Sequence, residues 1–436
     1  MRKYSIVLIA VSLVALAFCI KRDLIFAKDY AGDLRNRVVG TRLIKDGISP
    51  YYYKWETKDG IRYYDQAAFF PAKVSNITGT PFFQELLIPI ADYPQVTIQK
   101  IWLAVEYILF LVILVIALSF CSDLQHKAMV FTVSVLLLFT EAWKIHLSNQ
   151  QIYLFIPFFA ALFLYFFAKQ KGWYNYLITG IFAASFILIR PNSAIFFLPF
   201  IILLRQIPLK RIFFIAIPFI IAGCWILLDK AQLQYWKDFY VMLGEHVKAH
   251  QGLPVQLREI TPSPNYKEFE GINITENDKY EQKHSIISPS ESGNFFILFK
   301  KVFHRQIPYK ILSGLSIAMI IGLFYFFYRR NKDIVISKDY LILLAIFGFS
   351  LYMLSDLLSP VTRHQYYTVQ WFLPLLLVFA IYRPLFRWYY LSITIGLILN
   401  IGNHPMIKMQ YTIGEYLILI TLLLFCFSYT KKLAYE

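Results

Sequence analysis

The sequence predicts an all-α polytopic membrane protein with about 12 transmembrane helices. Of its 436 residues, 58% are hydrophobic and only 16% are charged, whereas a soluble domain is nearer half apolar and a quarter charged. The apolar surplus falls in blocks close to the ~20 residues that a helix needs to cross ~30 Å of hydrocarbon. Long polar segments at 21–97 and 229–305 interrupt the blocks. We therefore expect a single transmembrane domain over residues 1–436, with two large loops.

Twelve apolar blocks are the predicted spans. The first contains Ala15-Leu16-Ala17, which resembles a signal-peptide cleavage site, but the length of its apolar run favours a retained anchor. The sixth is short and bounded by Pro191 and Pro208, which is compatible with a tilted or broken helix. The blocks lie near residues 4–20, 98–120, 126–142, 151–168, 173–189, 192–204, 211–228, 306–328, 339–357, 366–382, 387–403 and 412–430.

Basic residues in the short loops set the orientation, because cytoplasmic loops carry an excess of Lys and Arg. With the N-terminus inside, the cytoplasmic loops collect Lys169, Arg205, Arg329 and Arg383 among others, with few acids. Both termini are then cytoplasmic in a plasma (inner) membrane, and both long segments are extracytoplasmic. The net charge of +16 is therefore mainly a topology signal, so we expect the lipid bilayer as a partner and no nucleic acid.

The first long segment is expected to form amphipathic helices on the membrane surface. One runs from Asp33 to Lys45, and Gly47 and Pro50 would stop it. Thr80-Pro81 would start a second, shorter one. The residues that recur at helical spacing in the first helix are Leu34, Val38, Thr41 and Ile44.

Asp33 has two readings. It can cap this helix, since Asp favours the N-cap and supports the helix dipole. It can also act as a catalytic base at the membrane surface, provided that one oxygen stays free for substrate. The two roles can coexist, and Asp29 is the next acid to consider.

The second long segment offers one candidate metal site. His246 and His250 stand four residues apart, a spacing that can chelate a metal on a helix. No third ligand is evident, and hydrated surface histidines are the commoner case. We therefore assign no metal site and no certain cofactor, and a divalent cation stays open.

Three of the predicted external turns are dense in polar residues. Polar groups at a helix mouth need partners, whether protein, water or ligand. A guanidinium there can snorkel to the headgroups or offer paired donors to a phosphate. Tyr51, in the first loop, can stack on a sugar or simply pack the loop. The candidate residues in the turns are Lys144, Asn149, Gln150, Arg190, Arg363, His364 and Tyr366.

Taken in order, these motifs resemble the integral-membrane glycosyltransferases of the GT-C fold, and most closely glycosyltransferase family 87, which uses polyprenol-phosphate-mannose. Asp33-Leu34 precedes Gly47-Ile48-Ser49-Pro50-Tyr51, similar to the family's aspartate and Gly-x-x-Pro-Tyr signature. Thr80-Pro81-Phe82 resembles its Pro-rich entry into the second helix. Asn149-Gln150 stands where the family has Gly-Gln, and Arg190-Pro191 where it has Lys-Pro. Ser359-Pro360, followed by His364 and Tyr366, resembles its late Ser-Pro turn.

The resemblance implies transfer of a mannose-like hexose from a polyprenyl-phosphate donor to an extracytoplasmic glycan or lipid acceptor, with inversion. Asp33 would be the general base. The donor phosphate would bind Arg190, Arg363, His364 and Lys144, and the sugar or acceptor would contact Asn149, Gln150, Asp29, Tyr51 and Tyr366.

Two alternatives stay open. An O-antigen or polysaccharide polymerase is also a many-helix glycosyltransferase, but it would use a diphosphate-linked donor and usually has arginine-rich external loops. A non-enzymatic lipid-sugar transporter or flippase would show charged residues near the middle of the membrane, broken paired helices and internal repeats.

Overall fold

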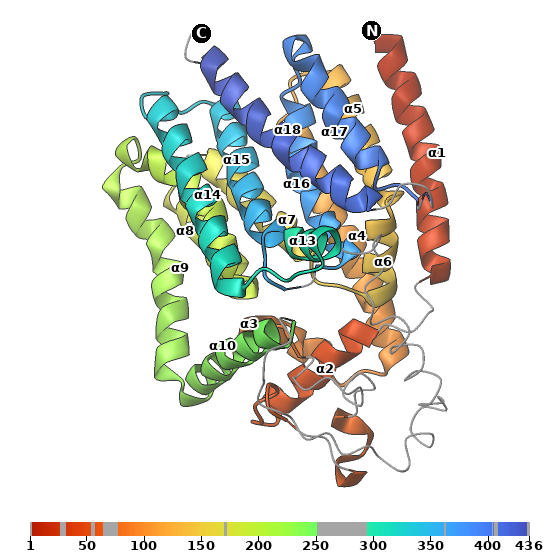
Figure 1. Ribbon diagram of the computed structural model, residues 1–436, viewed down its shortest axis with the longest axis vertical. Coiled ribbons are helices and arrows are strands. Elements are labelled where there is room, and N and C mark those ends of the chain that lie inside the picture. Colours follow the sequence, from red (N-terminus) through yellow and green to blue (C-terminus); the bar gives the residue numbers. More distant parts are fainter. Residues whose placement is uncertain are drawn as a thin grey trace.

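The computed structural model describes residues 2–26, 32–53, 57–63, 77–169, 172–250, 294–361, 363–402, 404 and 409–433. Within these ranges the chain forms helices and no strand (Figure 1). The helices are α1 (Arg2–Phe26), α2 (Gly32–Lys45), η1 (Thr57–Tyr63), α3 (Pro81–Leu87), η3 (Ile88–Ile90), α4 (Gln95–Ser119), α5 (Leu124–Leu138), α6 (Glu141–Asn149), α7 (Phe155–Lys169), α8 (Trp173–Ile189), η4 (Pro191–Arg205), α9 (Leu209–Leu228), α10 (Lys230–His250), α13 (Phe295–Phe303), α14 (Tyr309–Asn331), α15 (Lys338–Leu357), η5 (Gln365–Trp371), α16 (Phe372–Ala380), η6 (Pro384–Phe386), α17 (Arg387–Ile398) and α18 (Gln410–Leu433).

Six of these helices are long and apolar enough to cross a membrane: α1, α4, α9, α14, α15 and α18. The pair α5 and α6 would be a seventh span, bent by 59°. The predicted helical membrane protein is confirmed at this level, whereas the count of twelve spans is not. The shorter apolar helices are Pro81–Ile90, Phe155–Lys169, Trp173–Ile189 and Pro191–Arg205.

Two predicted spans differ from the structure for identifiable reasons. The block at 126–142 is not one straight helix, because α5 ends at Leu138 and α6 starts after Thr140. The Thr140 hydroxyl oxygen accepts the Trp143 backbone N–H at 3.2 Å, which caps the new helix. The block at 192–204 is a 3₁₀ helix that begins at Pro191 and contains Pro199, and proline cannot donate to an α-helical ladder.

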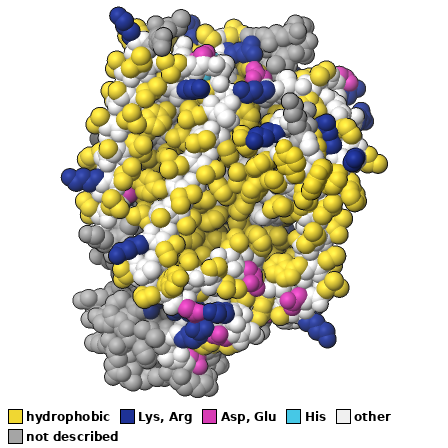
Figure 2. Space-filling view, turned by 180° about the vertical axis from the view of Figure 1, so that it is seen from behind, with side chains coloured by type: hydrophobic (Ala, Val, Ile, Leu, Met, Phe, Trp, Pro, Cys, Tyr) yellow, Lys and Arg dark blue, Asp and Glu magenta, His cyan; other side chains and the backbone are white. Residues whose placement is uncertain are grey.

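Both termini lie at one end of the helix bundle, and α2, α3 and α10 lie beyond the opposite end (Figure 1). We call these three helices the end layer. On the face shown in Figure 2, the surface between the two ends is broadly hydrophobic, and most charged side chains of the described residues gather toward the ends. This distribution is the one a bilayer requires of a protein that spans it.

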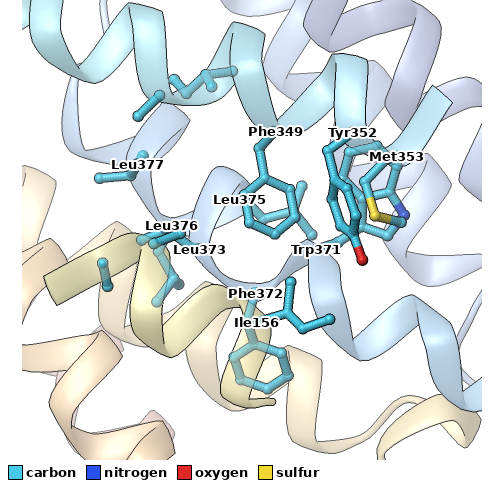
Figure 3. Close-up of a cluster of buried hydrophobic side chains, with 14 of the residues drawn as sticks. Ile156, Phe349, Tyr352, Met353, Trp371, Phe372, Leu373, Leu375, Leu376 and Leu377 are labelled. Atoms are coloured by element: carbon cyan, nitrogen blue, oxygen red, sulfur yellow. The ribbon is translucent and has the colours of Figure 1, made fainter. Parts of the chain in front are cut away.

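The bundle is built around α15. Of its most apolar 18-residue window, 94% is buried, against 6% for α9 at the periphery. Phe349, Tyr352 and Met353 of α15 meet Trp371 and Phe372 of the η5–α16 segment in this core (Figure 3). Gly348 lets η4 approach α15 closely, since a Cβ there would collide with the Phe196 carbonyl oxygen.

One buried acid joins α1 to the bundle. Asp23, near the end of α1, accepts hydrogen bonds from the Tyr107 hydroxyl at 2.7 Å and the Trp143 indole at 2.8 Å. The neighbouring Arg22 also donates to it, at 2.8 Å. A buried carboxylate needs such donors, so α1, α4 and α6 are fixed together at this point.

The end layer has its own small apolar core. The helix predicted from Asp33 to Lys45 is present as α2, and Thr80 caps α3 as expected. Gly47 has φ of 75° just after α2, a left-handed conformation that favours glycine. The core joins α2 to α10 and consists of Val39, Leu43, Ile44, Tyr51, Ile77, Tyr235, Trp236, Phe239 and Met242.

Candidate functional site

Asp33 lies in the first turn of α2 and is half-buried. Its carboxylate accepts a hydrogen bond from the Gln151 side-chain amide. The oxygen of that amide accepts from the Arg37 guanidinium at 2.7 Å. Arg37 and Gln151 are buried, with 7% and 0% exposure. The base candidate is therefore held against the turn that follows α6, in a row of acid, amide and cation.

The backbone of Gln150 explains how the chain reaches this position. Gln150 ends α6 with φ of 51°, the left-handed conformation in which helices commonly terminate. Its carbonyl oxygen lies 3.5 Å from the Arg37 guanidinium, and the next residue is Gln151. The Gln150 side-chain oxygen is buried and has no hydrogen-bond partner among the described residues.

Three tyrosines form what we call the tyrosine cluster: Tyr153, Tyr366 and Tyr367. Their ring centroids lie 5.5 Å apart for Tyr153 and Tyr366, 4.1 Å for Tyr153 and Tyr367, and 5.1 Å for Tyr366 and Tyr367. These distances fit tilted and offset aromatic packing. The cluster brings the turn after α6 against η5, residues more than two hundred positions apart in the sequence.

Arg190 lies against two rings of this cluster. Its guanidinium carbon is 5.1 Å from the Tyr153 ring centroid and 5.3 Å from that of Tyr367, which is within the range of cation–π attraction. It also forms an ion pair with Asp356 of α15. The side chain keeps 21% of its surface exposed, and its Nε donates to the Asn192 side-chain oxygen at 3.2 Å.

Asp356 leads from Arg190 into a buried chain of charges. Arg363 donates to Asp356 at 2.7 Å, and its two terminal nitrogens pair with Glu415 of α18, one of them at 2.9 Å. The side chains of Arg363, Asp356 and Glu415 are only 1–3% exposed. Four charges of alternating sign thus sum to zero: Arg190, Asp356, Arg363 and Glu415.

The tyrosine cluster lies in the electrostatic field of both groups. Burial and the negative charge of Asp33 raise the pKa of Tyr366. Burial raises the pKa of Tyr153, while the positive charges of Arg190 and Arg37 act in the opposite direction. Neither tyrosine lies in a helix long enough to span a membrane. Arg190 therefore packs against the tyrosine cluster, and Asp33 acts on the same cluster through its charge.

The other predicted residues are placed unevenly. His364 is exposed and stacks on Tyr366, with ring centroids 5.1 Å apart. Lys144 forms an ion pair with Glu141 at 3.3 Å, and Asn149 is the last residue of α6. Asp29, like the side chains of His246 and His250, lies outside the described residues.

Two of the predicted site residues make all of their contacts within the protein. Tyr51 is 1% exposed in the core of the end layer, and its hydroxyl donates to the Gly79 carbonyl at 2.8 Å. This position gives it no open face for a sugar. The Arg363 guanidinium donates its hydrogen bonds to Asp356 and Glu415. It therefore supports Arg190 and does not itself face a phosphate.

Sequence reasoning missed several residues that the structure brings to this region. Arg37, Gln151 and Tyr153 were passed over because each is ordinary at its position in the sequence. Asp356 and Glu415 carried a usable signal, since both are acids within predicted spans. An ionisable residue at membrane depth is rare and usually has a named partner.

Glu106 carries the same signal, and its partner is His146. Glu106 is midway along α4, and its carboxylate lies 3.0 Å from His146 Nε2 of α6. Both side chains are fully buried. Among the described residues no group of three or more His, Cys, Asp or Glu could hold a metal ion, so this pair is not part of such a site.

The fold and these buried polar groups define a polytopic helical membrane protein with a polar junction at one end of its bundle. Comparison with protein-family models, with curated proteins and with solved structures finds no match. The proposals that follow therefore depend on the geometry and on the motif resemblance alone.

Proposed function

We propose that the protein is a membrane glycosyltransferase that moves a mannose-like hexose from a polyprenyl-phosphate donor to a glycan or lipid acceptor. The observation that carries the proposal is that Arg190 packs against the tyrosine cluster, whose Tyr366 lies in the field of Asp33. An acid and a cation near one aromatic cluster suit a reaction that needs both a base and an anion receptor. The resemblance to family 87 motifs adds the substrate class and the extracytoplasmic side.

Asp33 and Arg190 have separate tasks in this reaction. Asp33 takes the proton of the acceptor hydroxyl as its oxygen attacks the anomeric carbon. The new bond forms between that oxygen and the anomeric carbon, while the bond from the anomeric carbon to the phosphate oxygen breaks. The leaving polyprenyl phosphate keeps the electron pair, and Arg190 stabilises its negative charge. Attack opposite the leaving group inverts the anomeric centre.

The test is sugar transfer by the purified protein in nanodiscs with labelled hexosyl polyprenyl phosphates. Asp33→Asn should lower the rate by about 10²–10⁴-fold, the usual contribution of a general base. Asp92→Asn is the control, because Asp92 is an exposed acid that pairs with Lys45 and Arg62. Near-wild-type transfer by Asp33→Asn would remove the assigned role. Lipid-linked sugar profiles of cells with and without the gene would identify the donor.

A second candidate, a lipid-sugar flippase or proton-linked transporter, is favoured by the Glu106–His146 pair. Ionisable pairs midway along a span are typical of transport pathways. The test is movement of a fluorescent polyprenyl phosphate across liposomes that contain the protein. Glu106→Gln should stop it under this reading, and Glu141→Gln, an acid paired with Lys144 on α6, should not. Transfer without lipid movement excludes the flippase.

A further inference from the structure

Arg37 is one helical turn after Asp33 on the same side of α2, and Gln151 lies between their charged groups. The Gln151 Nε2 donates to Asp33, and its Oε1 accepts from Arg37 at 2.7 Å. Both contacts are side chain to side chain across the junction of the end layer and the bundle. The amide is the only link between the two charges that these hydrogen bonds provide.

This order of atoms is dictated by chemistry. A guanidinium has donors only and a carboxylate has acceptors only, whereas a glutamine amide has both. Turning the Gln151 amide over would set its oxygen against the carboxylate and its N–H₂ against the guanidinium. Arg37 therefore decides which way the amide lies, and so decides that Asp33 receives a donor.

The arrangement fixes the orientation of Asp33. The hydrogen bond occupies one carboxylate oxygen, Oδ2, which fixes the plane of the group and leaves Oδ1 for another partner. A general base needs this orientation, because its free oxygen must reach the proton that it abstracts.

We infer that Arg37 and Gln151 are positioning residues that hold Asp33 oriented for proton abstraction. The inference depends on the proposed function for its catalytic meaning. Its effect on Asp33 is a property of the folded protein, which can be measured without any substrate. Neither residue touches the reacting atoms, so each acts through Asp33.

The test is labelling of Asp33 at neutral pH by dicyclohexylcarbodiimide, a carboxyl reagent, measured by peptide mass spectrometry on the intact protein. Freeing the carboxylate from its hydrogen bond should raise the labelling rate by about 10-fold in Gln151→Leu and Arg37→Leu. Gln151→Glu removes the amide donor without changing the length of the side chain, so it should raise the rate to a similar extent. Arg37→Lys keeps a charged donor and should stay near wild type.

Arg42→Leu is the matched control. Arg42 lies on the same helix and donates to the Ala91 and Arg62 carbonyls at 2.8 and 3.0 Å, so it should leave Asp33 labelling unchanged. Unchanged labelling in Gln151→Leu and Arg37→Leu, or an equal rise in Arg42→Leu, would overturn the inference. If the leucine variants do not fold, the isosteric Gln151→Glu compared with Arg37→Lys decides.

Transfer kinetics separate this inference from the proposed function. If the wild-type protein transfers sugar, Gln151→Leu should lower kcat on the order of 10-fold with little change in donor KM. An equal loss through KM alone would contradict a positioning role. If the wild-type protein transfers nothing, the proposed function fails, while the labelling result still decides whether Arg37 and Gln151 control Asp33.

Discussion

Two groups of charges near the tyrosine cluster are arranged differently. In the first group Asp33 and Arg37 are separated by a neutral amide, and Asp33 stays half-buried. In the second group Arg190 begins a continuous chain of ion pairs that ends at Glu415, 1% exposed in α18. The first group keeps a carboxylate available, whereas the charges of the second group pair with one another.

A charged residue at the end of a helix is therefore not by itself a binding group. Arg190 and Arg363 belong to the same chain, yet 21% of one side chain is exposed and only 1% of the other. Arg190 is thus the more accessible of the two side chains. Arg363 works as structure, because a buried cation is tolerated when carboxylates surround it. Four substitutions test this contrast.

The largest effect on stability is expected for Glu415→Leu. It leaves the buried Arg363 with a single shared carboxylate, which should cost about 3–5 kcal/mol. The double variant Arg363→Met/Glu415→Leu should recover most of that loss, since Arg190 and Asp356 still balance. Unfolding in detergent micelles measures both. The control is Asp339→Asn, which breaks an ion pair with Arg383 that is about one-third exposed and should lose little stability. An equally small loss of stability in Glu415→Leu would show that the buried chain of ion pairs does not stabilise the fold.

Arg190→Ala should weaken binding of a polyprenyl phosphate by about 10- to 100-fold, because hydrogen bonds to charged groups contribute ~1.5–3 kcal/mol. Arg190→Lys should fall between, since it keeps the charge and loses the planar fork. Titration of tryptophan fluorescence in micelles gives the affinity. The control is Arg211→Ala, because Arg211 also lies over an aromatic ring, that of Tyr176, at 4.9 Å. Equal affinities of the two alanine variants would show that Arg190 is not part of a phosphate site.

Tyr153→Leu should have a smaller effect on the same titration. It removes one ring beside Arg190, and a cation–π contact contributes ~0.5–2 kcal/mol. Tyr153→Phe keeps the ring and should bind close to wild type. If the phenylalanine variant loses as much affinity as the leucine variant, the hydroxyl and not the ring is the feature that matters.

Lys144→Ala should have the smallest effect. Its ion pair with Glu141 is partly exposed, with 40% and 27% exposure of the two side chains, and such pairs contribute within ~1 kcal/mol. Both unfolding and polyprenyl-phosphate affinity should stay near wild type. An affinity loss as large as that of Arg190→Ala would extend the anion site to α6. It would also weaken the contrast between the two groups of charges near the tyrosine cluster.

The fold was largely accessible from the sequence where apolar runs are long and uninterrupted. The blocks at 98–120, 211–228 and 339–357 correspond to α4, α9 and α15. The straight span at 126–142 was wrong because hydropathy is insensitive to a threonine cap, and Thr140 starts a new helix in the middle of an apolar block. Proline spacing correctly marked 192–204 as irregular.

The site was accessible only in part. The sequence pattern singled out Asp33, Arg190 and Tyr366, which the structure gathers around one cluster. It could not distinguish Arg190 from Arg363, because their difference arises from Asp356 and Glu415, which reach them from α15 and α18. It also passed over Gln151, whose role depends on the left-handed turn at Gln150 and not on any motif.

The Glu106–His146 pair has a consequence for biosynthesis. Glu106 leaves the ribosome 40 residues before His146, so α4 meets the membrane while its acid has no histidine. A charged residue at a helix centre costs about 2.5–3.5 kcal/mol on insertion scales. The unbroken apolar run from Ile108 to Leu118 offsets that cost at roughly 0.3–0.6 kcal/mol per large residue. The helix is thus expected to enter first and acquire its partner later, an order that glycosylation mapping of chains truncated before and after residue 146 would test.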